Sequence, residues 1–132
     1  MANKTLNGEC LCGEISWQMN GPFEFFGMCQ CSRCRKVTGA AFATNLFVKP
    51  GQFIWLKGEN NRNEYLLPKP NTFGNASCKT CGSRVPRNTA RGWVLVPLGS
   101  TMKLPGIKPT LVCPDDHTEW FTTLESTITE QS

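Results

Sequence analysis

Three cysteines, Cys29, Cys31 and Cys34, lie within six positions of one another. The spacing C-x-C-x-x-C lets three thiol side chains converge on one soft metal ion, and three protein ligands on zinc leave a fourth position open. Core packing explains this stretch poorly, because Arg33 and Arg35 lie within and beside it. The spacing therefore predicts a metal centre at which a thiol could bind and ionise.

Four further cysteines form two pairs on either side of this stretch, Cys10 with Cys12 and Cys78 with Cys81. A closed structural zinc site needs four ligands, and the two pairs supply four from distant parts of the chain. Such a site would fasten the N-terminal region to the later half of the chain. We therefore expect one closed metal site and one incomplete site.

Two other assignments of the cysteines remain open. A zinc ribbon would join Cys31 and Cys34 to Cys78 and Cys81, but it leaves the other three clustered cysteines without a role. Disulfides are typical of small secreted domains. Residues 1–5 lack the apolar core of a secretory signal, so we expect a cytoplasmic protein in which these clusters bind metal.

The elements that position these residues are predicted to be short strands between Gly and Pro turns. One turn of helix is expected from Ser32 to Val37, ended by Gly39. Residues 41–48 and 52–56 are predicted to pair as strands across a turn at 49–51. Other strands are predicted at residues 14–19, 63–67, 91–98, 110–113 and 119–124. The strand at residues 91–98 should be buried on both faces.

These elements predict a mainly β protein, a small single domain of short antiparallel strands stapled by zinc. The domain covers residues 1–132, with a core of about residues 8–124 and a polar C-terminal tail. The aromatic residues at 23–28 are expected in this core. Cys113 is a candidate for a fourth metal ligand or a buried apolar thiol, and burial is expected. His117 is expected to be an exposed loop residue.

Charge and hydropathy exclude several classes of partner. The formal charge is +4, and Lys and Arg form no run of five or more, so we expect no nucleic-acid partner. The sequence contains no apolar run long enough to cross a bilayer, so no membrane partner is expected.

Three motifs, at residues 9–15, 29–39 and 73–83, resemble those of the glutathione-dependent formaldehyde-activating (GFA) family in order and spacing. The resemblance implies a β-rich zinc fold shared with a Rab-exchange-factor-like group. It also implies two zinc ions. The structural ion would be held by Cys10, Cys12, Cys78 and Cys81, and the catalytic ion by Cys29, Cys31 and Cys34.

The resemblance implies a carbon–sulfur lyase that joins or cleaves a thiol such as glutathione and formaldehyde or another small aldehyde, with S-(hydroxymethyl)glutathione as the family product. Basic side chains are candidates for pairing with the carboxylates of glutathione. These are Arg33, Arg35, Lys36, Arg84, Arg87 and Arg91. Two alternatives stay open: a non-catalytic zinc-stabilised binding module, and a thiol or redox sensor whose three-cysteine stretch loses metal and oxidises.

Overall fold

The computed structural model describes residues 4–101, 103 and 105–131 of the chain. The described strands are β1 Thr5–Glu9, β2 Ser16–Asn20, β3 Phe25–Cys29, β4 Ala43–Val48, β5 Phe53–Lys57, β6 Arg62–Leu66, β7 Gly74–Cys78, β8 Arg87–Asn88, β9 Val94–Pro97 and β10 Thr110–Val112. The helices are α1 Ser32–Thr38 and α2 Leu124–Thr127, and the 3-10 turns are η1 Pro50–Gln52, η2 Glu59–Asn61, η3 Leu98–Ser100, η4 Pro114–Asp116 and η5 Glu119–Thr123. The predicted mainly β single domain is confirmed.

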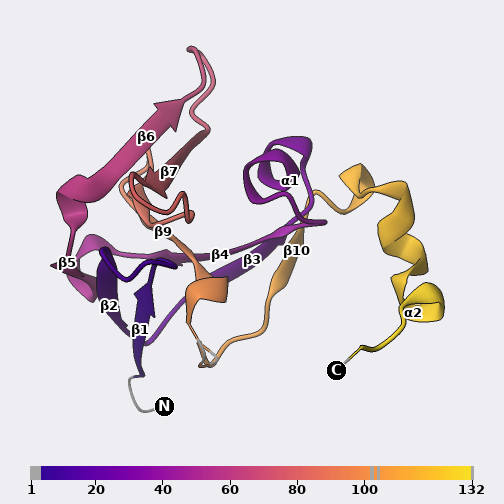
Figure 1. Cartoon of the computed structure of the whole chain (residues 1–132), viewed down its shortest axis with the longest axis horizontal. Helices are drawn as coiled ribbons and strands as arrows, with labels where there is room; N and C mark the ends of the chain where they lie inside the picture. Colours follow the sequence, from indigo (N-terminus) through magenta and orange to yellow (C-terminus); the bar gives the residue numbers. More distant parts are fainter. Residues whose placement is uncertain (1–3, 102, 104, 132) are drawn as a thin grey trace.

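The strands form three sheets (Figure 1). The largest has the order β10-β3-β4-β9-β8, the second the order β1-β2-β5, and β6 pairs with β7 in the third. All of these pairs are antiparallel except β3 with β10, which is parallel. The prediction of antiparallel strands therefore holds for every described pair but one.

The hydrophobic core is made by the buried faces of the two larger sheets. Trp17 and Met19 alternate with half-buried polar residues along β2, which is the pattern of a strand with one face covered. Val94–Val96 of β9 are all buried, as predicted for this strand. Full burial of such apolar side chains contributes roughly 1.5–3 kcal/mol each, so the sheets form a firm base for the loops that carry the cysteines.

Helix α1 begins and ends at the residues that the sequence indicates. The sulfur of Cys31 accepts a hydrogen bond from the backbone N–H of Cys34 at 3.4 Å and so caps the N-terminus. Gly39 ends the helix with φ of 65°, a left-handed conformation that glycine adopts without steric cost. The predicted helix and its stop are confirmed.

The strand predicted at residues 52–56 is present as β5, but its predicted partner is wrong. β5 pairs with β2, whereas β4 pairs with β3 and β9. The side chain of Gln52 folds back on the turn, where its carbonyl oxygen accepts from the backbone N–H of Lys49 at 2.9 Å. The turn carries the chain to the next sheet, where the ring of Trp55 packs edge-on against Trp17 at 6.2 Å.

The strand predicted at residues 119–124 is also wrong, because this segment forms η5 and runs into α2. Thr122 and Thr123 donate their hydroxyl protons to carbonyl oxygens three residues earlier, which favours helical turns over extended chain. The ring of Phe121 packs on Phe42 at 5.7 Å. This C-terminal segment lies at the right edge of Figure 1, beyond β10.

Candidate metal centre

The first group of thiols joins the turn between β1 and β2 to the end of β7. Cys10 and Cys12 lie in the turn between β1 and β2, Cys78 ends β7, and Cys81 follows in the next turn. All four sulfur atoms lie within 4.8 Å of one another. The Cys10 and Cys12 sulfurs are 3.6 Å apart, and those of Cys12 and Cys78 are 3.8 Å apart. We call this group the four-cysteine cluster.

Hydrogen bonds act differently on the thiols of the four-cysteine cluster, because the pKa of Cys81 is lowered whereas burial and the neighbouring thiols raise the pKa of Cys12. The backbone N–H of Ile15 donates to the sulfur of Cys10 at 3.3 Å. Hydrogen bonds from the side chain and backbone of Ser83 lower the pKa of Cys81 to about 5. Gly82, between these two residues, has φ of 78°, a left-handed conformation that glycine adopts without steric cost. Four sulfurs at this spacing fit a tetrahedral metal such as zinc.

The second group of thiols is assembled at the start of α1. Cys29 ends β3, Cys31 is the N-cap of α1, and Cys34 lies in the first turns of the helix. All three are buried, and their sulfur atoms lie within 4.8 Å of one another. Burial raises the pKa of Cys34 above its ordinary value, so a metal or other positive charge is needed to hold it as a thiolate. We call this group the three-cysteine cluster.

One polar side chain from the sheet reaches the three-cysteine cluster. Asn45 of β4 is buried, and its amide Nδ2 lies 4.0 Å from the sulfur of Cys34, to which it donates. Its Oδ1 accepts from Nη1 of Arg84 at 2.9 Å, and Nε of Arg84 donates to Asn75 Oδ1 at 2.8 Å. Sequence analysis missed Asn45. The available signal was a polar residue at an inward position of an otherwise apolar strand.

The structure separates the alternative cysteine assignments. Cys31 and Cys34 belong to a cluster that contains neither Cys78 nor Cys81, so the zinc-ribbon arrangement is not formed. All eight cysteines are free thiols. Each of the two clusters could hold a metal ion, and all-sulfur ligand sets suit zinc.

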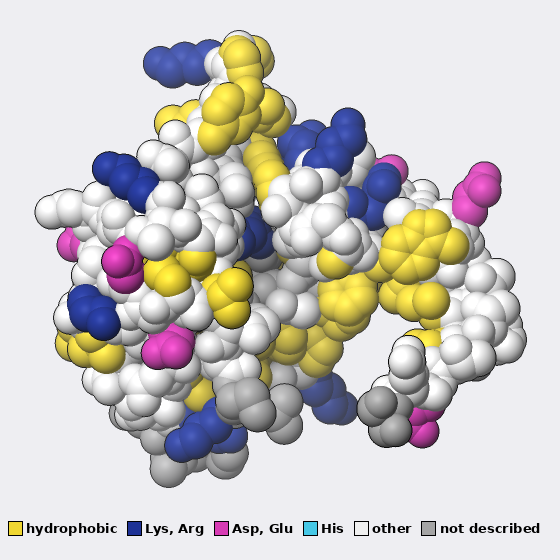
Figure 2. All heavy atoms as spheres, in the orientation of Figure 1, with side chains coloured by type: hydrophobic (Ala, Val, Ile, Leu, Met, Phe, Trp, Pro, Cys, Tyr) yellow, Lys and Arg dark blue, Asp and Glu magenta, His cyan; other side chains and the backbone are white. Residues whose placement is uncertain are grey.

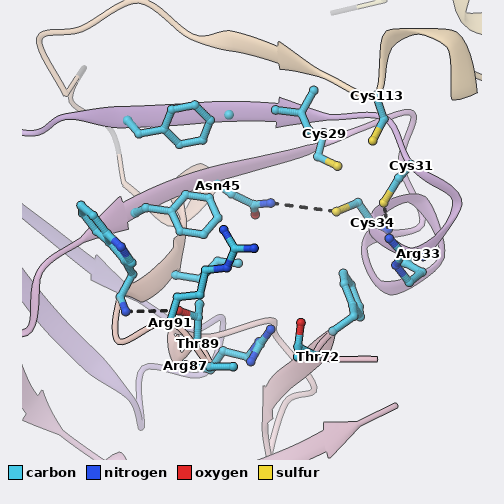
Figure 3. Close-up of a pocket in the computed structure, with 18 of the residues that line it drawn as sticks. Cys29, Cys31, Arg33, Cys34, Asn45, Thr72, Arg87, Thr89, Arg91 and Cys113 are labelled. Carbon is cyan, nitrogen blue, oxygen red and sulfur yellow. Dashed lines mark hydrogen bonds between the residues drawn. The ribbon is translucent and has the colours of Figure 1, made fainter. Parts of the chain in front are cut away.

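A cavity of about 550 Å³ opens beside the three-cysteine cluster (Figure 3). Cys29, Cys31 and Cys34 line one side, and Arg87 and Arg91 lie on the opposite side. The walls between them are largely apolar and include Phe25, Phe47, Phe73, Trp93 and Leu95. Among the residues that the structure describes, none from the four-cysteine cluster lines this cavity. The two clusters therefore differ in access to a ligand.

One family model matches most of the chain. Residues 5–119 match the model of the family described as glutathione-dependent formaldehyde-activating enzyme. The chain belongs to this GFA family. The match covers both clusters and the residues that line the cavity, so the resemblance found in the three sequence motifs extends over most of the chain.

A solved structure supports the fold of this GFA-family chain. A crystal structure of a Rhodobacter sphaeroides protein matches it with a TM-score of 0.55 and 21% sequence identity, covering 83% of this chain and 93% of that one. At this identity the likeness bears on the fold alone. The search of curated proteins gave no significant match. No helix among the described residues is long and apolar enough to cross a membrane.

Three of the basic residues predicted to meet a substrate line the cavity of this GFA-family protein. They are Arg33, Arg87 and Arg91. The guanidinium of Arg33 lies over the ring of Phe73, 5.6 Å from its centroid. In Figure 2, Lys and Arg side chains gather over α1, while hydrophobic side chains cover the tip of the β6–β7 pair at the top of the view.

The other three predicted cations have different positions. Arg35 forms an ion pair with Asp116 at 3.5 Å and donates from Nε to the carbonyl oxygen of Gln30 at 3.0 Å. Arg84 does not line the cavity and donates to Asn45, which does, and to Asn75. Lys36 is exposed on α1 and does not line the cavity.

Three further predictions have mixed outcomes. Cys113 is exposed at the rim of the cavity, so its predicted burial is wrong; η4 begins directly after it and turns the chain outward. His117 is exposed, as predicted. Of the aromatic residues at 23–28, Phe23 is buried in the core, but Phe25 is half-buried and forms part of the cavity wall.

Proposed function

We propose that this chain is a zinc-dependent carbon–sulfur lyase that joins glutathione, or a similar thiol, to formaldehyde or another small aldehyde, and cleaves the adduct in reverse. One observation carries the proposal: the three-cysteine cluster lines a cavity large enough for a small ligand, and the four-cysteine cluster does not. Pockets of about 300–1,000 Å³ are typical of small-molecule sites. A protein in which both metal sites are purely structural would not require one cysteine cluster to line a cavity while the other does not.

In this proposal the chain holds two zinc ions, one in each cluster. The four-cysteine cluster is closed by its own ligands and is structural. Cys29, Cys31 and Cys34 would hold the second zinc, which would supply a Lewis acid that lowers the pKa of a substrate thiol. We place the enzyme in the cytoplasm, where thiols stay reduced.

The residues of the chain have three tasks in this reaction. The apolar walls formed by Phe47, Trp93 and Leu95 exclude water from the thiol and the aldehyde. Asn45 orients Cys34 through its amide. The substrate sulfur then bonds to the carbonyl carbon, the carbon–oxygen π bond opens, and the thiol proton ends on the new hydroxyl oxygen. The reverse reaction breaks the same carbon–sulfur bond.

The test is exchange NMR with ¹³C-formaldehyde and glutathione, which follows free and thiol-bound formaldehyde at equilibrium. The wild-type protein should accelerate exchange, and Cys31→Ser should lose the acceleration while its far-UV circular dichroism is unchanged. Lys36→Gln, which removes a cation outside the cavity, should keep wild-type rates. Equal exchange with and without the wild-type protein would rule out the proposed activity with these substrates.

A further inference from the structure

Arg87 is a buried cation whose hydrogen-bonding capacity is incompletely used. Its side chain is only 6% exposed, which is rare for arginine. Nη1 donates to the carbonyl oxygen of Asn88 at 3.2 Å. Nε is buried and has no partner among the described residues. A buried guanidinium with an unused donor is costly unless an anion completes its hydrogen bonds.

The acidic side chain whose charge acts on Arg87, Glu64, pairs with another arginine. Burial lowers the pKa of Arg87, and the charge of Glu64 acts in the opposite direction. The carboxylate of Glu64 forms its ion pair with Nη1 of Arg62, at 3.6 Å, and is partly exposed to solvent. The negative charge of Glu64 therefore favours the charged form of Arg87. Within the described part of the chain, however, no ion pair joins the two side chains.

The guanidinium of Arg87 is held in place by the two strands on either side. The backbone of Arg87 pairs with Leu95 in the β8–β9 ladder. On the other side, a Cβ added at Gly74 of β7 would lie 3.3 Å from Cζ of Arg87. Glycine at this position lets the guanidinium pack against the strand backbone. A group fixed in this way loses little conformational entropy when it binds a ligand.

Apart from the cysteines, the charged side chains that line the cavity are basic among the described residues. Arg33, Arg87 and Arg91 line it, and no Asp or Glu is among the described residues that do so. Figure 3 shows Arg87 and Arg91 across the cavity from the cysteines. A ligand whose sulfur lies at the three-cysteine cluster would therefore extend toward these two arginines.

We propose that Arg87 is a specificity-determining residue, which binds a carboxylate of the thiol substrate at the end of the cavity opposite the three-cysteine cluster. A planar guanidinium matches a carboxylate with two parallel hydrogen bonds, which a lysine cannot do. The assignment of the ligand as a thiol rests on the proposed function. The assignment of an anion site to Arg87 rests on its burial, its unused donor and the charge of the cavity.

The test is isothermal titration calorimetry with S-methylglutathione and with its diethyl ester. The methyl group blocks the sulfur, so binding is measured apart from any reaction, and the ester removes the carboxylate charges. The wild-type protein should bind the acid at least about tenfold more tightly than the ester, because the ester cannot form a charge-assisted hydrogen bond with the guanidinium. Arg87→Gln should abolish this preference, Arg87→Lys should retain part of it, and Lys36→Gln should leave it unchanged.

The outcomes separate this inference from the proposed function. Equal affinity of the wild-type protein for acid and ester overturns the inference, and so does an unchanged preference in folded Arg87→Gln. If Arg87→Gln fails to fold, the wild-type comparison and Arg87→Lys decide. A preference that depends on Arg87, in a protein that forms no adduct with formaldehyde, would leave the anion site standing and reject the lyase. Formation of the adduct by a protein that does not prefer the acid to the ester would support the lyase and reject the anion site.

Discussion

The amide of Asn45 donates to the sulfur of Cys34 over 4.0 Å, and its oxygen accepts from Arg84 at 2.9 Å. Arg84 is thereby linked through one side chain to the three-cysteine cluster. Groups that hydrogen-bond to metal ligands orient them, and their loss typically lowers metal affinity or activity about 10–100-fold.

We expect Asn45→Leu to weaken metal binding at the three-cysteine cluster by about 10–100-fold. It should also lower the free energy of unfolding by about 1–3 kcal/mol, because Arg84 loses a buried acceptor. Metal affinity is measured by competition with a chromophoric chelator, and stability by urea denaturation. Asn75→Leu is the matched control: it removes the other acceptor of Arg84 and leaves Cys34 untouched. A loss of affinity in both variants would assign the effect to Arg84 alone.

Metal should leave the two clusters at different rates. The three-cysteine cluster faces the cavity, whereas the four-cysteine cluster would surround a metal ion with four ligands of its own. Treatment with a chelator should therefore release about one equivalent of zinc rapidly, with little change in circular dichroism, and a second slowly as the fold is lost. Metal release and circular dichroism are recorded together, by stopped flow for the rapid phase and after manual mixing for the slow phase.

Two serine variants assign the phases of metal release. Cys31→Ser should fold and lack the rapid phase. Cys81→Ser should unfold or aggregate, because it opens the closed cluster that joins β1–β2 to β7. Collapse of both variants to the same extent would contradict a division between structural and reactive metal sites.

Gly58 is expected to tolerate no side chain. It has φ of 78°, and an added Cβ would collide with the carbonyl oxygen of Glu14, which follows the Cys10–Cys12 turn. Gly58→Ala should destabilise the protein by at least about 1–3 kcal/mol, from left-handed strain and the clash together. Gly51→Ala is the control, because a Cβ added there would meet nothing within 4 Å, and it should be nearly neutral. Thermal unfolding of the two variants side by side measures the difference.

Asp116 joins the C-terminal segment to the start of α1. Its Oδ2 accepts from the backbone N–H of Ser32 at 2.9 Å, and its Oδ1 pairs with Arg35 at 3.5 Å. Exposed ion pairs contribute only about 0–1 kcal/mol, so Asp116→Ala should change global stability little. Limited proteolysis should nevertheless cut more rapidly after residue 113. Asp115→Ala, at the exposed neighbouring position, should be cleaved at the wild-type rate. Faster cleavage of this variant would show that loss of one negative charge is sufficient to increase proteolysis.

Local signals in the sequence predicted the elements whose causes are local. The span of α1 follows from the residues at its ends, since Cys31 caps it and Gly39 adopts the left-handed conformation that stops it. The pairing of β5 with β2 depends instead on where the η1 turn directs the chain. No pattern within residues 41–56 contains that information.

Contacts between distant residues explain what sequence analysis missed. β1 was not predicted because Gly8 weakens its strand pattern, yet a Cβ at Gly8 would lie 2.6 Å from the ring of Trp17, so a larger residue would not fit. Arg87 was one of six equivalent cations in the sequence. Its guanidinium packs close to Gly74, which belongs to a different strand. The cysteine spacing indicated metal, but only the packing of the sheets shows which cluster faces a cavity.

The separation of Cys12 from Cys78 by 66 residues sets an order for biosynthesis. The first pair of thiols leaves the ribosome long before the second pair exists, and β8 and β9, which bring Arg87 and Trp93 to the cavity, are made later still. Until the second pair emerges, the first has no native sulfur partners. A nascent chain therefore cannot complete the four-cysteine cluster before Cys81 has been translated, and the cavity is completed after that.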